Sequence, residues 1–205
     1  GSLSLYMAAR YPNSRITGGS NSASQREVIL SRAAECGLNN LEIITCDVNV
    51  LQFPLDAQFD RVVSVEMFEH MRNYQTLLKR ISTWLKPEGT LFVHIFTHQH
   101  YAYPFEVKDD SDWMAKYFFT GGIMPSDDLL LYFQNDLKLM NHWQVSGQHY
   151  QKTAEAWLKN MDAHREPIMQ LFKQTYGAAH AVKWWNYWRV FFMSCAELWG
   201  YRHGT

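Results

Sequence analysis

Helix-like and strand-like stretches alternate along the first hundred residues, and this alternation constrains the fold more than any other feature. Alternation of this kind is typical of parallel βαβ units, in which each helix returns the chain to the next strand. The first half therefore predicts an α/β fold with a doubly wound sheet. The expected order is helix 3–11, strand 14–17, helix 22–37, strand 41–47, strand 59–65, helix 73–86, turn 87–89 and strand 90–96.

The second half of the chain departs from this rhythm and carries most of the large aromatic clusters. Aromatic residues make up 15% of the chain, and they gather in "WMAKYFF", "LLLYF" and "VKWWNYWRVFFMSCAELW". We expect a strand at residues 142–150, followed by helices at 151–176 and 178–199. Open α/β sheets bind ligands beyond the carboxyl ends of their strands, so the helices are expected to form a lid there.

Composition limits the partners. The formal net charge is −1 and 19% of the residues are charged, which argues against a nucleic-acid-binding surface. The three cysteines share no CxxC or metal-ligand spacing, so we expect reduced thiols, no structural metal and a cytoplasmic location. No uncharged run reaches the roughly 18 residues of a membrane span. GxSxG, HExxH, GxxxxGK[ST] and GxGxxG are all missing from the sequence, so hydrolase, zincin and kinase hypotheses have no motif.

Polar residues follow the predicted strands. Ser20 and Gln25 come after the first strand and could hydrogen-bond hydroxyl groups, while Asp47 follows the second and could accept from an exocyclic amine. Helix capping and turn formation are ordinary alternative roles for such residues. Together they favour a nucleoside-binding edge of the sheet.

Glu66, Glu69 and His70 follow the third strand in "VEMFEHM". In a helical turn, positions i, i+3 and i+4 share one face, so these side chains would converge. A neighbouring carboxylate and burial both raise the pKa of a carboxyl group, which would suit one glutamate to accept a proton near neutrality. The alternative is a helix N-terminus stabilised by acidic side chains. His94 lies in a strand, as a core residue or facing the cleft, and His149 and Tyr150 could close a strand facing the same cleft.

These segments resemble the class I S-adenosylmethionine-dependent methyltransferases, in the branch of cyclopropane fatty-acid synthases, mycolic-acid modifying enzymes and plant coclaurine-type N-methyltransferases. "SVEMFEHM" is the hallmark of the branch, and "TGGSNSASQ", "TCDV", "KYFFTGGIMPS" and "NHWQVSGQHYQKTAEAW" continue the match along the chain. The resemblance implies a Rossmann-like sheet with a helical lid, apparently truncated at both ends. Residues 1–100 would be the cofactor-binding part and residues 101–205 the lid or substrate part with a remaining sheet strand, in one structural domain.

The resemblance also implies a cofactor and roles for individual residues. S-adenosyl-L-methionine would be bound by Gly1 at the end of the glycine-rich loop, by Ser20 and Gln25 at the ribose, and by Asp47 and Val48 beside the adenine. In the cyclopropane enzymes, positions matching Glu69, His94 and Tyr150 hold a bicarbonate base. In the N-methyltransferases, positions matching Glu66, Glu69 and His70 lie around the amine.

We therefore expect a methyltransferase that methylates a small aromatic or alkaloid-like amine by in-line transfer, with a glutamate or histidine as base. The lid aromatics Tyr101, Tyr103, Phe105, Trp113 and Phe119 would shape an apolar pocket that can accept a cation. One alternative is methylene transfer to a lipid alkene, and another is a catalytically incomplete fragment. Unpaired strand edges would favour pairing with another chain, for example as a homodimer.

Overall fold

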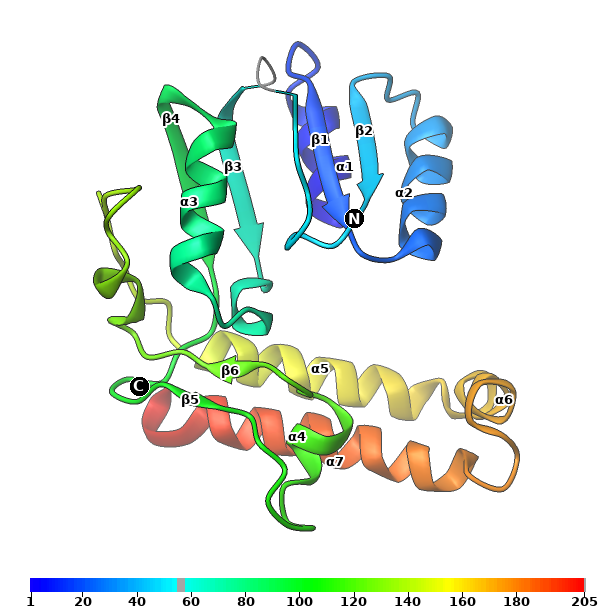
Figure 1. Ribbon diagram of the computed structural model, residues 1–205. Helices are drawn as coiled ribbons and strands as arrows, with labels where there is room; N and C mark the ends of the chain where they lie inside the picture. Colours follow the sequence, from blue (N-terminus) through cyan, green and yellow to red (C-terminus); the bar gives the residue numbers. More distant parts are fainter. Residues whose placement is uncertain (55–57, 205) are drawn as a thin grey trace. The chain divides into compact units, whose positions relative to one another are not determined.

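The computed structural model describes residues 1–54 and 58–204, which form two compact units (Figure 1). The first unit comprises Gly1–Val62 with Arg80–Thr90, and the second comprises Val63–Lys79 with the residues from Leu91 onward. These bounds differ from the expected division at residue 100, which stays a prediction. The elements that supply residues to both units are β3 (Phe59–Val65), α3 (Tyr74–Trp84) and β4 (Leu85–His94).

The first unit begins with two helices and two strands in alternation: α1 (Ser2–Arg10), β1 (Ile16–Ser20), α2 (Ala23–Glu35) and β2 (Leu41–Thr45). β1 and β2 are parallel, with Ile16 opposite Leu41 and Ser20 opposite Thr45. Ser22 caps α2 by accepting a hydrogen bond from the backbone N–H of Gln25, and Gly37, with φ +65°, follows its end. The expected helices and strands of this segment are confirmed in order, although β1 begins at Ile16 and continues through Gly18 and Gly19 to Ser20 instead of covering residues 14–17.

β3 and β4 form a second two-stranded sheet, and β1–β2 and β3–β4 are not joined into one sheet within residues 1–54 and 58–204. The turn expected at residues 87–89 is wrong, because these residues belong to β4. Pro87 removes one N–H donor, which an edge strand tolerates. A Cβ on Gly89 would lie 2.9 Å from the carbonyl oxygen of Phe59, so the glycine lets β4 approach β3 closely.

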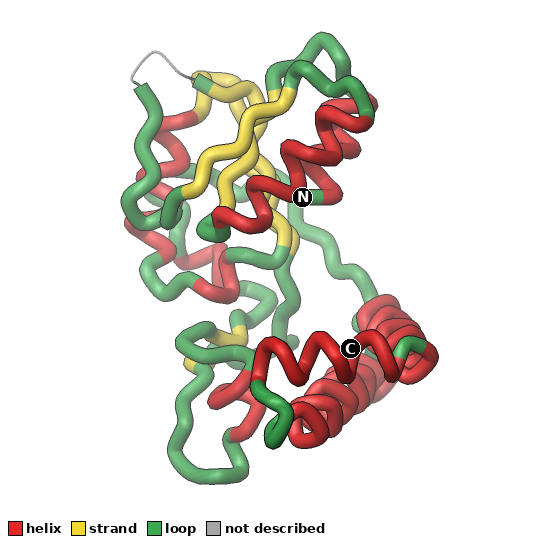
Figure 2. Tube along the Cα trace, turned by 90° about the vertical axis from the view of Figure 1, so that its right-hand side faces the viewer, coloured by secondary structure: helices red, strands yellow, loops and turns green. Residues whose placement is uncertain are grey.

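The second unit is mainly helical. α5 and α7 run alongside each other (Figure 1), and Figure 2 shows the helices in red and the loops that connect the elements in green. The thiol of Cys195 is buried in α7. The long helices of the second unit are α5 (Gln148–Ala163), α6 (Arg165–Tyr176) and α7 (Ala181–Gly200). The short elements of this unit are η1 (Phe68–His70), β5 (Tyr103–Pro104), α4 (Trp113–Tyr117), β6 (Ile123–Met124), η2 (Leu129–Tyr132) and η3 (Tyr201–His203).

Two expectations for the second half are wrong. Residues 142–146 form no strand, because no neighbouring strand pairs with them in the described part of the chain, and residues 148–150 open α5 instead. The helix expected over 151–176 is broken at His164, whose φ of −111° and ψ of 34° are not helical. α5, α6 and α7 share a core of Met161, Met169, Phe172, Ala181 and Trp185. None of the helices in the described ranges is long and apolar enough to cross a membrane.

Candidate active site

The segment after β3 makes a sharp change of direction that sets the position of Glu66. Glu66 has φ +52°, in the left-handed region that side chains other than glycine rarely occupy. Its backbone N–H donates to the carbonyl of His94 at 2.9 Å, which links the ends of β3 and β4. The helical turn begins only at Phe68 and has 3-10 geometry. Left-handed backbone in a residue with a long side chain is uncommon and is often found at functional sites.

His94 and Tyr150 gather around the carboxylate of Glu66. The Nδ1 atom of His94 lies 3.0 Å from Oε1 of Glu66, and the ring centroids of His94 and Tyr150 are 6.3 Å apart. Burial, followed by a hydrogen-bonding contact with Glu66, raises the pKa of the Tyr150 hydroxyl. Tyr150 reaches this place from the first turn of α5, whereas His149 beside it is exposed. Tyr150 thus lies beside His94, and it is carried by the first turn of a helix instead of the expected strand.

Glu69 is the buried carboxyl group of this cluster. Its residue surface is only 3% exposed, and its Oε2 atom has no hydrogen-bond partner within the described residues. Burial, and to a smaller extent the negative charge of Glu66, raise the pKa of Glu69 from 4.5 to about 7. The expected rise in the pKa of one glutamate is therefore found at Glu69. A carboxyl group that titrates near neutrality can accept a proton under physiological conditions.

His70 does not follow the expected geometry. Its side chain is exposed, and it makes no side-chain hydrogen bond or ion pair with residues 1–54 or 58–204. Glu66 and Glu69 lie close enough for the charge of Glu66 to raise the pKa of Glu69, but the helical i, i+3 and i+4 arrangement that was expected to bring His70 to the same face is not formed. The reason is that Glu66 precedes the turn with left-handed backbone, so the three residues do not lie on one helix.

Two aromatic residues, Tyr74 and Trp199, pack against this cluster, and the sequence analysis does not predict them as site residues. Tyr74 is 2% exposed, and its hydroxyl donates to the carbonyl of Phe68 at 2.9 Å. Trp199, at the end of α7, stacks on Tyr150 with a centroid distance of 4.7 Å. Tyr74 opens a predicted helix and Trp199 lies among many aromatics, so neither spacing nor composition marks them.

Aromatic rings lead from the expected lid towards Tyr150. Phe105 and Phe119 stack at 5.3 Å, and Phe96 lies edge-on to both Phe119 and Trp199, at 6.1 and 6.0 Å. Of the other lid residues, Tyr103 contacts Phe105, Tyr101 contacts His98 and His100, and Trp113 contacts Phe118 and Tyr187.

The carboxyl ends of β1 and β2 carry the expected nucleoside-binding residues. Because Ser20 lies opposite Thr45 in the parallel register, Ser20 and Asp47 occupy the same edge of this sheet. The Ser20 hydroxyl donates to Oε1 of Gln25 at 2.9 Å, and the Nε2 donors of Gln25 have no partner within residues 1–54 and 58–204. Oδ1 of Asp47 accepts from the backbone N–H and side chain of Asn49, which leaves Oδ2 without a partner in the described ranges. The carbonyl of Val48 accepts from Arg80 at 3.2 Å.

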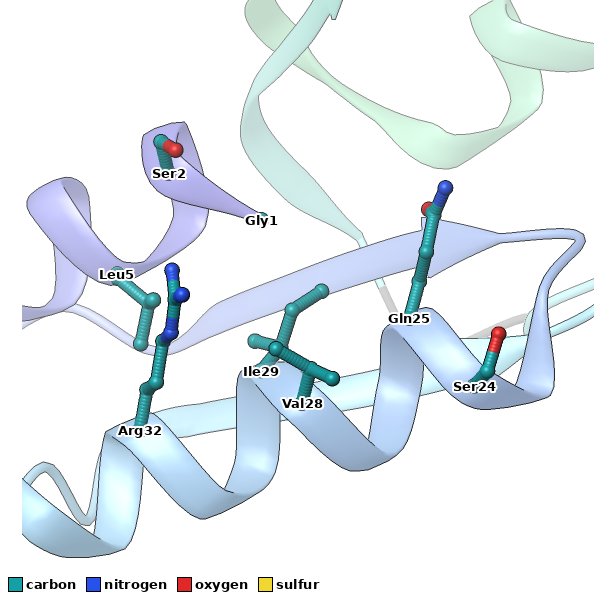
Figure 3. A pocket seen from close by; sticks show the side chains of 8 residues that line it. All are labelled: Gly1, Ser2, Leu5, Ser24, Gln25, Val28, Ile29 and Arg32. Atoms are coloured by element: carbon teal, nitrogen blue, oxygen red, sulfur yellow. The ribbon is translucent and has the colours of Figure 1, made fainter. Parts of the chain in front are cut away.

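Gly1 caps α1 and faces α2 across a pocket of about 240 Å³ (Figure 3). A Cβ on Gly1 would lie 2.3 Å from Cγ1 of Ile29, so any side chain here would collide with α2. Donors and acceptors that have no partner in the described part of the chain, at a strand edge, fit a nucleoside with hydroxyl and amino groups. The pocket is lined by Gly1, Ser2, Leu5, Ser24, Gln25, Val28, Ile29 and Arg32.

The chain is similar to one family model and to several known sequences. The family model described as mycolic acid cyclopropane synthetase matches residues 1–202. (S)-Coclaurine N-methyltransferase of Thalictrum flavum subsp. glaucum is 41% identical over 208 residues, which cover 100% of this chain and 57% of that protein. Cyclopropane-fatty-acyl-phospholipid synthase of Escherichia coli (strain K12) is 32% identical over 162 residues, which cover 77% of this chain and 38% of that protein.

Solved structures agree with these relatives. Coclaurine N-methyltransferase bound to N-methylheliamine and SAH matches with a TM-score of 0.91 and 40% identity, over 100% of this chain and 61% of that one. An apo mycolic acid cyclopropane synthase matches with a TM-score of 0.69 and 18% identity, over 92% of this chain and 71% of that one, which shows a shared fold. The chain spans about three fifths of the length of the N-methyltransferases that it matches.

Proposed function

The chain belongs to the mycolic acid cyclopropane synthetase family, and we propose that the protein is an S-adenosylmethionine-dependent methyltransferase that methylates the nitrogen of a small aromatic or alkaloid-like amine. The preference for an amine is supported by the (S)-coclaurine and pavine N-methyltransferases of Thalictrum flavum subsp. glaucum, at 41% and 38% identity. The single observation that carries the proposal is the buried Glu69, whose pKa of about 7 suits a base near neutral pH.

The proposed base answers a chemical requirement of the acceptor. An alkyl amine has a pKa of about 10, like lysine, and only its unprotonated form is a nucleophile. Glu69 would take the ammonium proton on Oε2, the oxygen that no described residue engages. Glu66, fixed by His94, would add negative charge that attracts the ammonium group. The rings of Phe105 and Phe119 would hold the aromatic part of the acceptor, and their faces also favour a cation.

S-adenosylmethionine, when bound, supplies an electrophilic methyl group on a sulfonium. Gln25 and Ser20 would bind its ribose hydroxyls, and Oδ2 of Asp47 would accept from the adenine amino group, with Val48 beside the ring. Gly1, at the start of α1, would contribute its backbone to the cofactor site, as the resemblance to the family implies. Holding the acceptor nitrogen in line with the methyl group can lower the barrier by several kcal/mol, on the order of 7 or more in favourable cases.

The test is an assay of the protein with labelled S-adenosylmethionine against a panel of benzylisoquinoline-like amines and against vesicles of unsaturated phospholipid. We expect label in the amine and none in the lipid. Glu69→Gln should abolish most of the transfer without weakening the binding of S-adenosylhomocysteine, and Asp47→Ala should weaken that binding. Label found only in the lipid would contradict the proposal.

Methylene transfer to a lipid alkene is the second candidate, supported by the family model and by the Escherichia coli relative. An alkene loses a proton only after attack, so a base held near Glu69, His94 and Tyr150 would act at a later stage of that reaction.

A further inference from the structure

The loop that contains Gly121 and Gly122 packs against the backbone of the turn Phe68–His70, which carries Glu69. Gly122 is buried, and a Cβ at this position would lie 2.9 Å from the carbonyl oxygen of Glu69. It would also lie 3.4 Å from Cδ2 of Phe105 and 3.7 Å from the carbonyl oxygen of Phe119. Because the nearest atom belongs to the backbone, no side-chain rotation can make room for a methyl group. The loop and the turn therefore touch through a contact that only glycine permits.

Hydrogen bonds from outside the turn fix the position of this loop. Nε of Arg72 donates to the carbonyl of Gly121 at 3.0 Å, and the backbone N–H of Phe105 donates to the carbonyl of Gly122 at 2.9 Å. Gly121 has φ +78°, which brings the two carbonyls into these orientations at no steric cost. The loop is thus held by hydrogen bonds from Arg72 and from Phe105, in addition to its contact with the turn.

We propose that Gly122 and Arg72 are positioning residues, which hold the turn of Glu69 so that its carboxyl group stays buried beside Glu66. This inference rests on the proposed function, in which that carboxyl group is the base. The turn has only three residues, Phe68–His70, so a displacement of its backbone is passed directly to the Glu69 side chain. Displacement would admit water to Oε2, and hydration favours the ionised form of a carboxyl group.

The groups that face Glu69 are themselves charged or able to ionise. They are Glu66, which raises its pKa, and the hydroxyl groups of Tyr74 and Tyr150, whose pKa values are raised in part by the charge of Glu69. A change in the titration of Glu69 must therefore be measured at Glu69 itself. Carbon-13 NMR of the glutamate carboxyl groups does this, with Glu69→Gln to assign the signal.

The experiment compares Gly122→Ala and Arg72→Gln with the unchanged chain and with Met169→Ala. Met169 belongs to the core of α5–α7, so its truncation lowers stability at a site away from the turn. We expect the pKa of Glu69 to fall by at least about one pH unit in Gly122→Ala and in the same direction in Arg72→Gln. Met169→Ala should leave it at about 7. If Gly122→Ala does not fold, Arg72→Gln decides alone.

A pKa of Glu69 that is the same in Arg72→Gln, Gly122→Ala and the unchanged chain would overturn the inference, even if the protein methylates amines. Conversely, a lowered pKa in a protein that transfers no methyl group to any amine would support the positioning role and reject the proposed function. Where amine methylation is found, Gly122→Ala should slow it about 10-fold or more and move its pH profile with the pKa of Glu69, because small displacements of reacting groups are costly.

Discussion

Glu69 keeps its Oε2 atom buried and without a hydrogen-bond partner among the described residues, and this arrangement makes the expected rate of reaction depend on pH. Below its pKa of about 7 the group carries a proton and cannot act as a base. We expect methyl transfer to rise with pH through this value. Glu69→Gln should lower kcat by about 10²- to 10⁴-fold and remove the rise. Initial rates between pH 5.5 and 9 measure this, and an unchanged profile in the variant would assign the titration to another group.

The same carboxyl group should make stability depend on pH. The folded-state pKa of about 7 lies above the ordinary value of 4.5, so between these values the folded chain keeps a proton that the unfolded chain releases. The free energy of unfolding should therefore fall as pH rises through this range, by on the order of 3 kcal/mol from this residue. Urea unfolding at pH 5 and pH 8.5 should show a smaller fall in Glu69→Gln. Equal falls in both proteins would contradict the burial of the charge.

At the scale of elements, the junction of α5 and α7 fixes Tyr150. A Cβ on Gly147, just before α5, would lie 2.5 Å from the carbonyl oxygen of Trp199 in α7. Gly147→Ala should lower the free energy of unfolding by about 1–3 kcal/mol, as overpacking does. Gly19→Ala is the matched control, because its Cβ would meet only Leu51, at 3.9 Å. Similar stability of the two variants in thermal unfolding would show that the junction can adapt.

Elements that depend on local pattern could be predicted from the sequence, whereas those that depend on partners could not. α2 has its Ser22 cap and its Gly37 stop within the segment itself, and it forms as expected. Residues 142–150 have the composition of a strand, but a strand needs a neighbour to hydrogen-bond its backbone. In the site, the sequence predicts that one glutamate has a raised pKa, but it does not predict the left-handed backbone of Glu66 or the packing of Gly122. These two features depend on contacts between residues that are distant in sequence.

At the scale of the whole molecule, the strands in the described part of the chain leave backbone groups without sheet partners. β1–β2 and β3–β4 are separate pairs within the described residues, and open edges of this kind invite pairing with another chain. We expect the 205-residue chain to associate as its concentration rises, with a homodimer as the first species. Sedimentation equilibrium over a hundredfold range of concentration tests this, and a monomer throughout would reject it.

The three thiols are divided between the two units, so their rates of alkylation can report the local opening of each unit separately. Cys36 is exposed and Cys46 half-buried in the first unit, whereas Cys195 is buried in α7, where burial raises its pKa to about 12. Alkylation requires the thiolate. Iodoacetamide should therefore modify Cys36 and Cys46 first and reach Cys195 only when the helices around it separate. The rate at which Cys195 is alkylated, followed by mass spectrometry, would therefore report how often the second unit opens, independently of the first unit.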